Sequence, residues 1–392
     1  MSGVTAKPLI AIACGGTGGH LFPGLAVGEA LRAHGCDVTL LISPKEVDQQ
    51  AVKSAHGFRI ATLPAVAFQS RAPQRFVLGF ARSFLATRLL FRERAPSAVL
   101  AMGGFTAAPP VLAGKLCGAT VFLHESNTIP GRANRWLARW VHTAFVGFSE
   151  AAKRLASTRV IITGTPVRPQ FVGLDMARCR SAVGLDPQRP VLLVTGGSQG
   201  ASGVNDLQLA ALPQLATTFP ELQYIHLTGS SDVEKVRAAY AACSVNAVVE
   251  PFLAQMELAL GAATAAVSRA GASSLAELAA TRLPAVLVPF PAATDNHQFF
   301  NARAFAETGA AKMLEQKPGA AERLVEMLNG FFNDSEARNA IAAALARWHT
   351  PDAAERIAGG ILQTIRHGHS VPPQSGSACA PNNLSVFQTA LR

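Results

Sequence analysis

Charged residues make up only 15% of this 392-residue chain, and its six cysteines contain no C-x-x-C pair. Scattered cysteines of this kind argue against a disulfide framework or a zinc finger and favour a reduced, cytoplasmic compartment. Long apolar runs are also missing, since the longest stretch, Phe76 to Phe91, contains Arg82 and Arg88. The N-terminal apolar run is too short for a signal peptide or a membrane span.

Acidic residues are scarce in the first half of the chain. Residues 1–168 carry 19 Lys and Arg against 7 Asp and Glu, a net charge of +12, whereas residues 169–392 carry −2. The basic half predicts an anionic partner, which is a nucleic acid, an acidic lipid or a phosphorylated substrate. An aromatic RNA-binding motif is absent, so nucleic acid is the least favoured of the three.

Apolar residues make up 49% of the chain and fall into short runs that alternate with helical patterns. The first series of predicted strands covers 9–13, 38–42, 98–102, 120–124, 143–146 and 160–163. A second series covers 191–195, 222–227, 247–249, 265–268 and 285–288. This βαβ rhythm predicts an α/β protein with two Rossmann-like parallel sheets, whose ligands bind at the carboxyl ends of the strands.

The predicted domains are 1–168 and 169–350, with the proline-containing stretch 169–190 as the link. An amphipathic helix at 351–367 is expected to pack back on the first domain. Residues 370–392 contain few large apolar residues and are expected to be disordered.

Two glycine-rich turns each follow a predicted strand. Gly15-Gly16-Thr17-Gly18-Gly19-His20 follows the first strand, with a helix expected from about Pro23, and Gly196–Gly200 follows Val191–Thr195. Such turns let a phosphate approach the backbone and the start of a helix. Neither spells a dinucleotide or P-loop motif, so an ordinary strand-to-helix connection is the alternative. His20 favours a catalytic role for the first turn, because an imidazole titrates near neutrality and can act as a general base.

Polar or glycine residues also end several other strands. In the first series these are Gly103-Gly104-Phe105, His124–Asn127 and Gly164–Arg168. In the second series, Arg269–Leu278 is a small-residue turn that enters a helix carrying Glu277, and 289–298 is a loop that supplies amide and imidazole groups before a helix. Helix capping is the structural alternative for single residues. Their convergence on one edge favours a binding site.

The stretch Arg71–Arg94 is rich in Phe, Leu and Arg. On a helix, Phe76, Phe80, Phe84 and Phe91 form one stripe, which is expected to be core. Another side carries Leu78, Leu85 and Leu89 beside Arg75 and Arg82. That side is either a solvated face or an interfacial membrane surface.

Taken together, these motifs resemble the two-domain GT-B glycosyltransferases, and in particular the MurG family. The resemblance covers about residues 9–365 and rests on GGTGGH, GGF, HESN, GTPVR, GGSQG, SRAGASSLAE and DNHQ…NA in this order. It implies an inverting transfer of N-acetylglucosamine from UDP-N-acetylglucosamine to the 4-hydroxyl of undecaprenyl-pyrophosphoryl-N-acetylmuramoyl-pentapeptide (lipid I), which makes lipid II for peptidoglycan. It also implies a peripheral position on the cytoplasmic face of the bacterial inner membrane, where other cell-wall synthesis proteins are candidate partners.

The resemblance further implies roles for individual residues. His20 is the expected catalytic base. The residues implied for UDP-N-acetylglucosamine are Thr17, Gly18, Gly19, Asn127, Arg168, Ser198, Leu253, Arg269, Ala272, Ser273, Ser274, Leu275, Ala276, Glu277, Asp295 and Gln298. Those implied for the acceptor pyrophosphate are Gly15, Gly16, Gly103, Gly104 and Phe105. Thr165 and Ser126 stand where the family often has Asn and Gln.

No cofactor or metal is expected, because the chain has no D-x-D motif to hold a metal-bound pyrophosphate. Helix N-termini, Ser198 and Arg168 would stabilise the leaving UDP instead. The alternatives are another GT-B transferase, a UDP-N-acetylglucosamine 2-epimerase and a nucleotide-binding module without catalysis. The basic first half argues against the epimerase, and His20 in an intact GGTGGH argues against the module.

Overall fold

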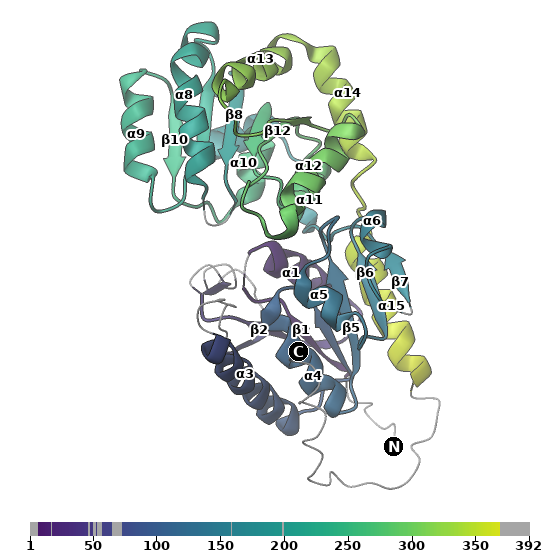
Figure 1. Ribbon diagram of the computed structural model, residues 1–392. Helices are drawn as coiled ribbons and strands as arrows, with labels where there is room; N and C mark the ends of the chain where they lie inside the picture. Colours follow the sequence, from purple (N-terminus) through teal and green to yellow (C-terminus); the bar gives the residue numbers. More distant parts are fainter. Residues whose placement is uncertain are drawn as a thin grey trace, which may run out of the picture.

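The computed structural model describes residues 7–16, 18–45, 48–49, 52, 57–64, 73–157, 159–197 and 200–368. These residues form two parallel sheets, each flanked by helices, one above the other in Figure 1. This arrangement confirms the predicted α/β class with two Rossmann-like sheets.

The first sheet has the strand order β3-β2-β1-β4-β5-β6-β7. Its strands are β1 (Leu9–Ala13), β2 (Asp37–Ile42), β3 (Arg59–Thr62), β4 (Ala98–Ala101), β5 (Thr120–Glu125), β6 (Thr143–Val146) and β7 (Val160–Ile162). The helices between them are α1 (Gly18–Ala33), α3 (Pro73–Glu93), α4 (Ala108–Leu116), α5 (Arg132–Leu137) and α6 (Ser149–Ala152), with the short 3-10 helix η2 (Phe105–Ala107) before α4.

Alternate side chains of the first sheet enter two separate cores, as the two-residue period of a strand requires. Ile10 and Ile12 pack in one core with helix α1 and with Ile361 of α15 (Ala353–Gly368). Ala11 and Ala13 face the other core, on the side of α3, α4 and α5. Helix α15, the last helix among the described residues, therefore lies against the first sheet, as the yellow ribbon in Figure 1 shows.

The second sheet has the strand order β10-β9-β8-β11-β12-β13. Its strands are β8 (Val191–Thr195), β9 (Gln223–Leu227), β10 (Ala247–Glu250), β11 (Ala265–Ser268), β12 (Ala285–Leu287) and β13 (Lys312–Met313). The helices are α7 (Met176–Ala182), α8 (Ser202–Thr218), α9 (Val233–Ala242), α10 (Met256–Ala262), α11 (Ala272–Thr281), α12 (His297–Glu307), α13 (Ala320–Asn333) and α14 (Ser335–Ala346), with η3 (Pro169–Phe171) and η4 (Thr294–Asn296).

The structure differs from the sequence prediction in three places. Strands β3 and β13 were not predicted, because β3 is an exposed edge strand and β13 has only two residues. The stretch 169–190 is more than a link, since it holds α7 and buries Phe171, Cys179 and Leu185 in the second core. Helix α1 begins at Gly18, five residues before the predicted start, so Pro23 lies inside it.

The exposed side of α3 agrees with the prediction. Leu78, Leu85 and Leu89 are 58%, 60% and 62% exposed, whereas Phe91 is buried and Phe80 and Phe84 pack against the core. None of the described helices is long and apolar enough to cross a bilayer.

Candidate active site

A cleft of about 510 Å³ lies between the two sheets, at the carboxyl ends of their strands. In the first sheet the strand order reverses between β1 and β4, and in the second between β8 and β11. Loops that leave strands on either side of such a reversal diverge and open a crevice for ligands. Residues that follow all four of these strands line the cleft, among them His20, Gly104, Gly196 and Gly271.

The cleft brings together most of the residues that the sequence singled out. Those that line it are Gly18, Gly19, His20, Gly104, Phe105, Asn127, Arg168, Leu253, Arg269, Ala272, Ser273, Ser274, Glu277, Asp295 and Gln298. The residues that do not line it are Gly15, Gly16, Gly103, Leu275 and Ala276. Thr17 and Ser198 lie outside the described residues.

The first glycine turn is shaped by close packing of its backbone. A Cβ atom on Gly15 would lie 2.4 Å from the backbone nitrogen of Ser43, so only glycine fits there. The Gly16 N–H donates a hydrogen bond of 2.7 Å to the buried carboxylate of Asp48. These two glycines therefore support the turn from behind, and Gly18 and Gly19 form its cleft side.

His20 lies on the first turn of α1, with its ring against the loop that follows β4. A Cβ atom on Gly103 would come within 2.5 Å of the ring, and Gly103 has a φ of +124°. Burial lowers the pKa of the His20 imidazole, which the charges of Glu125 and Asp48 oppose and His297 reinforces. Its Nδ1 atom has no hydrogen-bond partner among the described residues. The ring is thus neutral at pH 7 and able to accept a proton.

Glu125 organises the loop that follows β5. Its carboxylate accepts hydrogen bonds from the backbone and side chain of Asn127, from the Gly131 N–H and from the Asn134 amide, at 2.8–2.9 Å. The carboxylate is only 2% exposed, so these donors satisfy a group that would be costly to bury alone. Glu125 belongs to the HESN motif at a strand end, but no sequence pattern predicted its role in this loop.

On the second sheet, helix α11 begins at Ala272 directly after Gly271, and no side chain caps its first turn. The free N–H groups of this turn and the helix dipole favour a negatively charged ligand in the cleft. Glu277 stands on the next turn, half-buried at the cleft wall. Burial raises the pKa of its carboxyl to about 7, a shift that Arg168 opposes and Glu257 reinforces.

Arg168 supplies a buried positive charge at the same wall. It is 9% exposed, and its guanidinium lies over the rings of Phe22 and Phe171, at 4.7 and 5.2 Å from their centroids. Its Nε and Nη2 atoms have no hydrogen-bond partner among the described residues. A buried guanidinium with donors to spare is suited to an anionic group.

Three other predicted side chains are already engaged within the protein. The Nη1 atom of Arg269 donates to the carbonyls of Val288 and Pro289 and to Gln316, and burial lowers the pKa of this guanidinium to about 10. Gln298 accepts a hydrogen bond of 3.0 Å from the Phe290 N–H through Oε1. Asp295 forms ion pairs with two arginines of helix α5.

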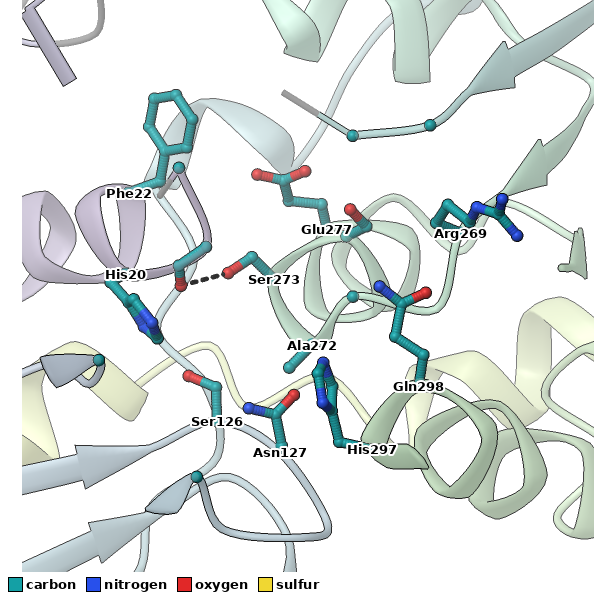
Figure 2. A pocket seen from close by; sticks show the side chains of 18 of the residues that line it. His20, Phe22, Ser126, Asn127, Arg269, Ala272, Ser273, Glu277, His297 and Gln298 are labelled. Carbon is teal, nitrogen blue, oxygen red and sulfur yellow. Dashed lines mark hydrogen bonds between the residues drawn. The ribbon is translucent and has the colours of Figure 1, made fainter. Parts of the chain in front are cut away.

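Besides the ion pairs of Asp295, two further sets of hydrogen bonds join the halves across the cleft. The Ser273 hydroxyl donates to the Gly19 carbonyl, drawn as the dashed line in Figure 2. The fully buried Asn301 accepts from the N–H and hydroxyl of Thr128 at 3.0 and 2.9 Å, and donates to Asn127. Asn301 belongs to the DNHQ…NA motif. Its hydrogen-bond partner Thr128 is 173 residues away in the sequence, so no local sequence pattern predicts this contact.

His297, whose imidazole belongs to the predicted 289–298 loop but was given no role of its own, also lines the cleft. Figure 2 shows His20 and His297 on opposite sides of the cleft, one from α1 and the other from α12. The Nδ1 atom of His297 lies 2.7 Å from the Thr294 carbonyl, which can only accept, so Nδ1 carries a proton.

Comparisons with known proteins agree with this geometry. Residues 10–146 match the glycosyltransferase family 28 N-terminal domain, and residues 191–357 match its C-terminal domain. A putative UDP-N-acetylglucosamine 2-epimerase from Listeria monocytogenes has a TM-score of 0.70 and covers 95% of this chain and 100% of its own. Its sequence is only 15% identical, so this likeness shows the fold alone.

Other relatives are similar in sequence as well. A UDP-N-acetylglucosamine--N-acetylmuramyl-(pentapeptide) pyrophosphoryl-undecaprenol N-acetylglucosamine transferase from Xanthomonas euvesicatoria is 38% identical, over 94% of this chain and 83% of that protein. One of the same name from Anaeromyxobacter sp. is 36% identical, over 92% and 94%. The crystal structure of Acinetobacter baumannii MurG is 26% identical with a TM-score of 0.69, covering 91% of this chain and 99% of that one. The chain has the GT-B fold and belongs to the MurG family of UDP-N-acetylglucosamine-dependent glycosyltransferases.

Proposed function

We propose that this protein transfers N-acetylglucosamine from UDP-N-acetylglucosamine to the 4-hydroxyl of lipid I, forming lipid II with inversion at the transferred carbon. The observation that carries the proposal is the position of His20. It faces, across one cleft, the uncapped start of helix α11. A base on one wall and an anion site on the other suit an in-line displacement between acceptor and donor.

His20 is the general base in this proposal. Its lowered pKa keeps the imidazole neutral, so it can take the proton from the acceptor hydroxyl as that oxygen attacks C1 of the donor sugar. The rings of Phe22 and Phe105 line the same cleft.

The second half holds the donor. The N–H groups at Ala272–Ser274 and the buried Arg168 stabilise the charge that develops on the leaving UDP. Glu277 accepts hydrogen bonds from the ribose hydroxyls, and Leu253 contacts the base. The Ser273 hydroxyl is engaged with Gly19, so its backbone contributes rather than its side chain.

Other donor contacts complete the sugar site. Gln298, Asn127, Gly18 and Gly19 line the cleft and supply amide groups for the sugar hydroxyls. Ser198 keeps its proposed role at the pyrophosphate, and Thr17 its proposed role in completing the donor site from the first half. No divalent metal takes part in this mechanism, since helix N–H groups and Arg168 stabilise the negative charge on the leaving UDP.

The acceptor approaches from the first half. Gly104 and Phe105 line the cleft beside His20 and form the acceptor side of the site, while Gly15, Gly16 and Gly103 shape the loops behind them. Acceptor and donor then meet at the His20 imidazole.

The outer face of α3 is proposed as the membrane contact. Val77, Leu78, Leu85 and Leu89 form an exposed apolar side of this helix, which Arg75, Arg82 and Arg88 accompany. Shallow apolar burial beside cations is how peripheral helices bind anionic bilayers. We therefore propose that the enzyme works at the cytoplasmic face of the bacterial inner membrane, where proteins of cell-wall synthesis are candidate partners.

One assay tests the function against its alternatives. Purified protein is incubated with UDP-[¹⁴C]N-acetylglucosamine and a lipid I analogue, and the products are separated. Label in a lipid-linked disaccharide supports the transferase. Conversion of the UDP-sugar without acceptor would identify an epimerase, and binding without turnover a non-catalytic module.

A further inference from the structure

The loop between β12 and α12 is tied to the opposite half of the molecule by one carboxylate. Asp295 Oδ1 lies 3.3 Å from Nη2 of Arg132, and Oδ2 lies 2.5 Å from Nη2 of Arg135. The two arginines are three residues apart on α5, so they share one face of that helix. Helix α5 belongs to the first sheet and the loop to the second, so this ion pair spans the cleft.

The loop has an unusual backbone at this point. Asp295 and the next residue, Asn296, both have left-handed φ angles, of 50° and 54°. This conformation is disfavoured for most residues with a Cβ atom, and Asp and Asn are the ones that adopt it most readily. The hydrogen bond from Arg132 and the charges of Arg132 and Arg135 also lower the pKa of Asp295, which keeps the carboxylate ionised.

Two side chains of the cleft depend on this turn. His297 and Gln298 follow it directly at the start of α12, and both line the cleft. His297 is bonded to the Thr294 carbonyl and Gln298 to the Phe290 N–H, so both are anchored to the loop itself. A shift of the loop would therefore move both groups together.

We propose that Arg132 and Arg135 are positioning residues that act through Asp295, holding the loop so that His297 and Gln298 face the donor sugar. In this role Asp295 does not itself contact the sugar hydroxyls. The identification of the ligand rests on the proposed function, whereas the coupling between the arginines and the loop does not. The side chains of Arg132, Arg135 and Asp295 are 62%, 43% and 27% exposed, so salt weakens the link.

The test compares Arg132→Gln with Arg135→Gln, Asp295→Asn, and all three changes combined. Arg139→Gln is the matched control, because Arg139 is an exposed arginine just beyond α5 and outside this ion pair. The substituted side chains are at least partly exposed, so these variants are expected to fold. Hydrogen–deuterium exchange of peptides from 289–298, measured without ligand, reports on the loop directly.

In the arginine double variant, we expect faster exchange across 289–298 and a KM for UDP-N-acetylglucosamine raised about threefold to tenfold at low salt, with kcat nearly unchanged. The difference from the parent shrinks at 0.5 M salt, and Arg139→Gln behaves as the parent. Asp295→Asn adds nothing further once both arginines are gone, because all three act as one unit.

Two results would overturn the proposal. If the effects of Asp295→Asn and the arginine changes are additive, Asp295 contacts the ligand directly. If exchange of 289–298 is the same in the parent and the double variant, the arginines do not hold the loop. If the parent protein neither binds nor transfers the sugar, the proposed function is wrong. The hydrogen–deuterium exchange of 289–298 in the parent and the double variant still tests whether the arginines hold the loop.

Discussion

The Ser273 hydroxyl lies 2.8 Å from the backbone carbonyl of Gly19 and donates a hydrogen bond to it across the cleft. This carbonyl has no intrahelical donor, because the residue four positions further along α1 is Pro23. Proline has no N–H, so Pro23 cannot donate to the carbonyl of Gly19 as the helical pattern would require. A proline inside one helix thus creates the acceptor that joins it to the start of another.

This relationship predicts a conditional effect of Ser273→Ala. Loss of one neutral hydrogen bond, worth about 0.5–1.5 kcal/mol, should raise the KM for the donor by about twofold to tenfold. In a Pro23→Ala background the helix supplies its own N–H to Gly19, so the same substitution should have a smaller effect. Steady-state kinetics of the four proteins measure this. An equal effect in both backgrounds would show that Ser273 acts on the ligand instead.

His20→Ala should lower kcat by about 10²–10⁴-fold, the usual contribution of a general base. The affinity for UDP should change little, because the imidazole acts on the acceptor hydroxyl. Single-turnover transfer and calorimetry of UDP binding separate the two quantities. A variant with near-normal kcat would remove His20 from the chemical step.

Glu277→Ala should mainly weaken donor binding, because a ribose contact exists in ground and transition states alike. The pKa near 7 adds a pH dependence. Only the carboxylate accepts two ribose hydrogen bonds, so kcat/KM for the donor should fall as the pH drops below 7, approaching about tenfold per unit. Calorimetry of UDP binding at pH 6 and 8 checks this, and pH-independent affinity in the parent would contradict it.

The raised pKa of Glu277 also predicts how the stability of the fold depends on pH. A carboxyl whose pKa is higher in the folded than in the unfolded protein binds its proton more tightly when folded. The free energy of unfolding therefore decreases as the pH rises from about 4.5 to 7. Glu277→Gln imitates the protonated form, so its melting temperature should exceed that of the parent by more at pH 8 than at pH 5.

Transfer should continue in EDTA without added magnesium or manganese. The expectation rests on the missing D-x-D motif and on the uncapped first turn of α11, which with Arg168 supplies positive charge to the pyrophosphate. Rates measured with and without EDTA decide it. Complete loss of activity that a divalent metal restores would mean that the leaving group needs an ion.

Arg75→Glu with Arg82→Glu should weaken binding to anionic vesicles and transfer to long-chain acceptors. Each cation near such a surface contributes about 1 kcal/mol, so reversing two should reduce binding by at least tenfold at low salt. Transfer to a short, water-soluble acceptor should be nearly unchanged. Arg178→Glu with Arg323→Glu is the control, since both are exposed arginines of the second half. Vesicle co-sedimentation measures the bound fraction of each protein. If that fraction is the same in both double variants, or does not change with salt, α3 has no membrane role.

The sequence alone predicted the two parallel sheets, because a strand buried on both faces must be a short apolar run wherever it occurs. Val191–Thr195 and Ala265–Ser268 were identified to the residue for this reason. The sequence also showed which strand ends carry unusual residues. In a parallel sheet all these ends point to one edge, so His20 and the turn before Glu277 could be expected near a ligand.

Only the tertiary structure decided which side chains remain free for that ligand. Arg269 and Asp295 lie at the cleft, yet their charged groups are paired within the protein. Gln298 is held there through its Oε1 atom, whereas Arg168 has two nitrogen atoms without a hydrogen-bond partner among the described residues. A motif indicates where a residue lies, because local patterns determine strands and turns. Hydrogen bonds such as those between Thr128 and Asn301 join positions far apart in the chain, and only folding brings them within reach.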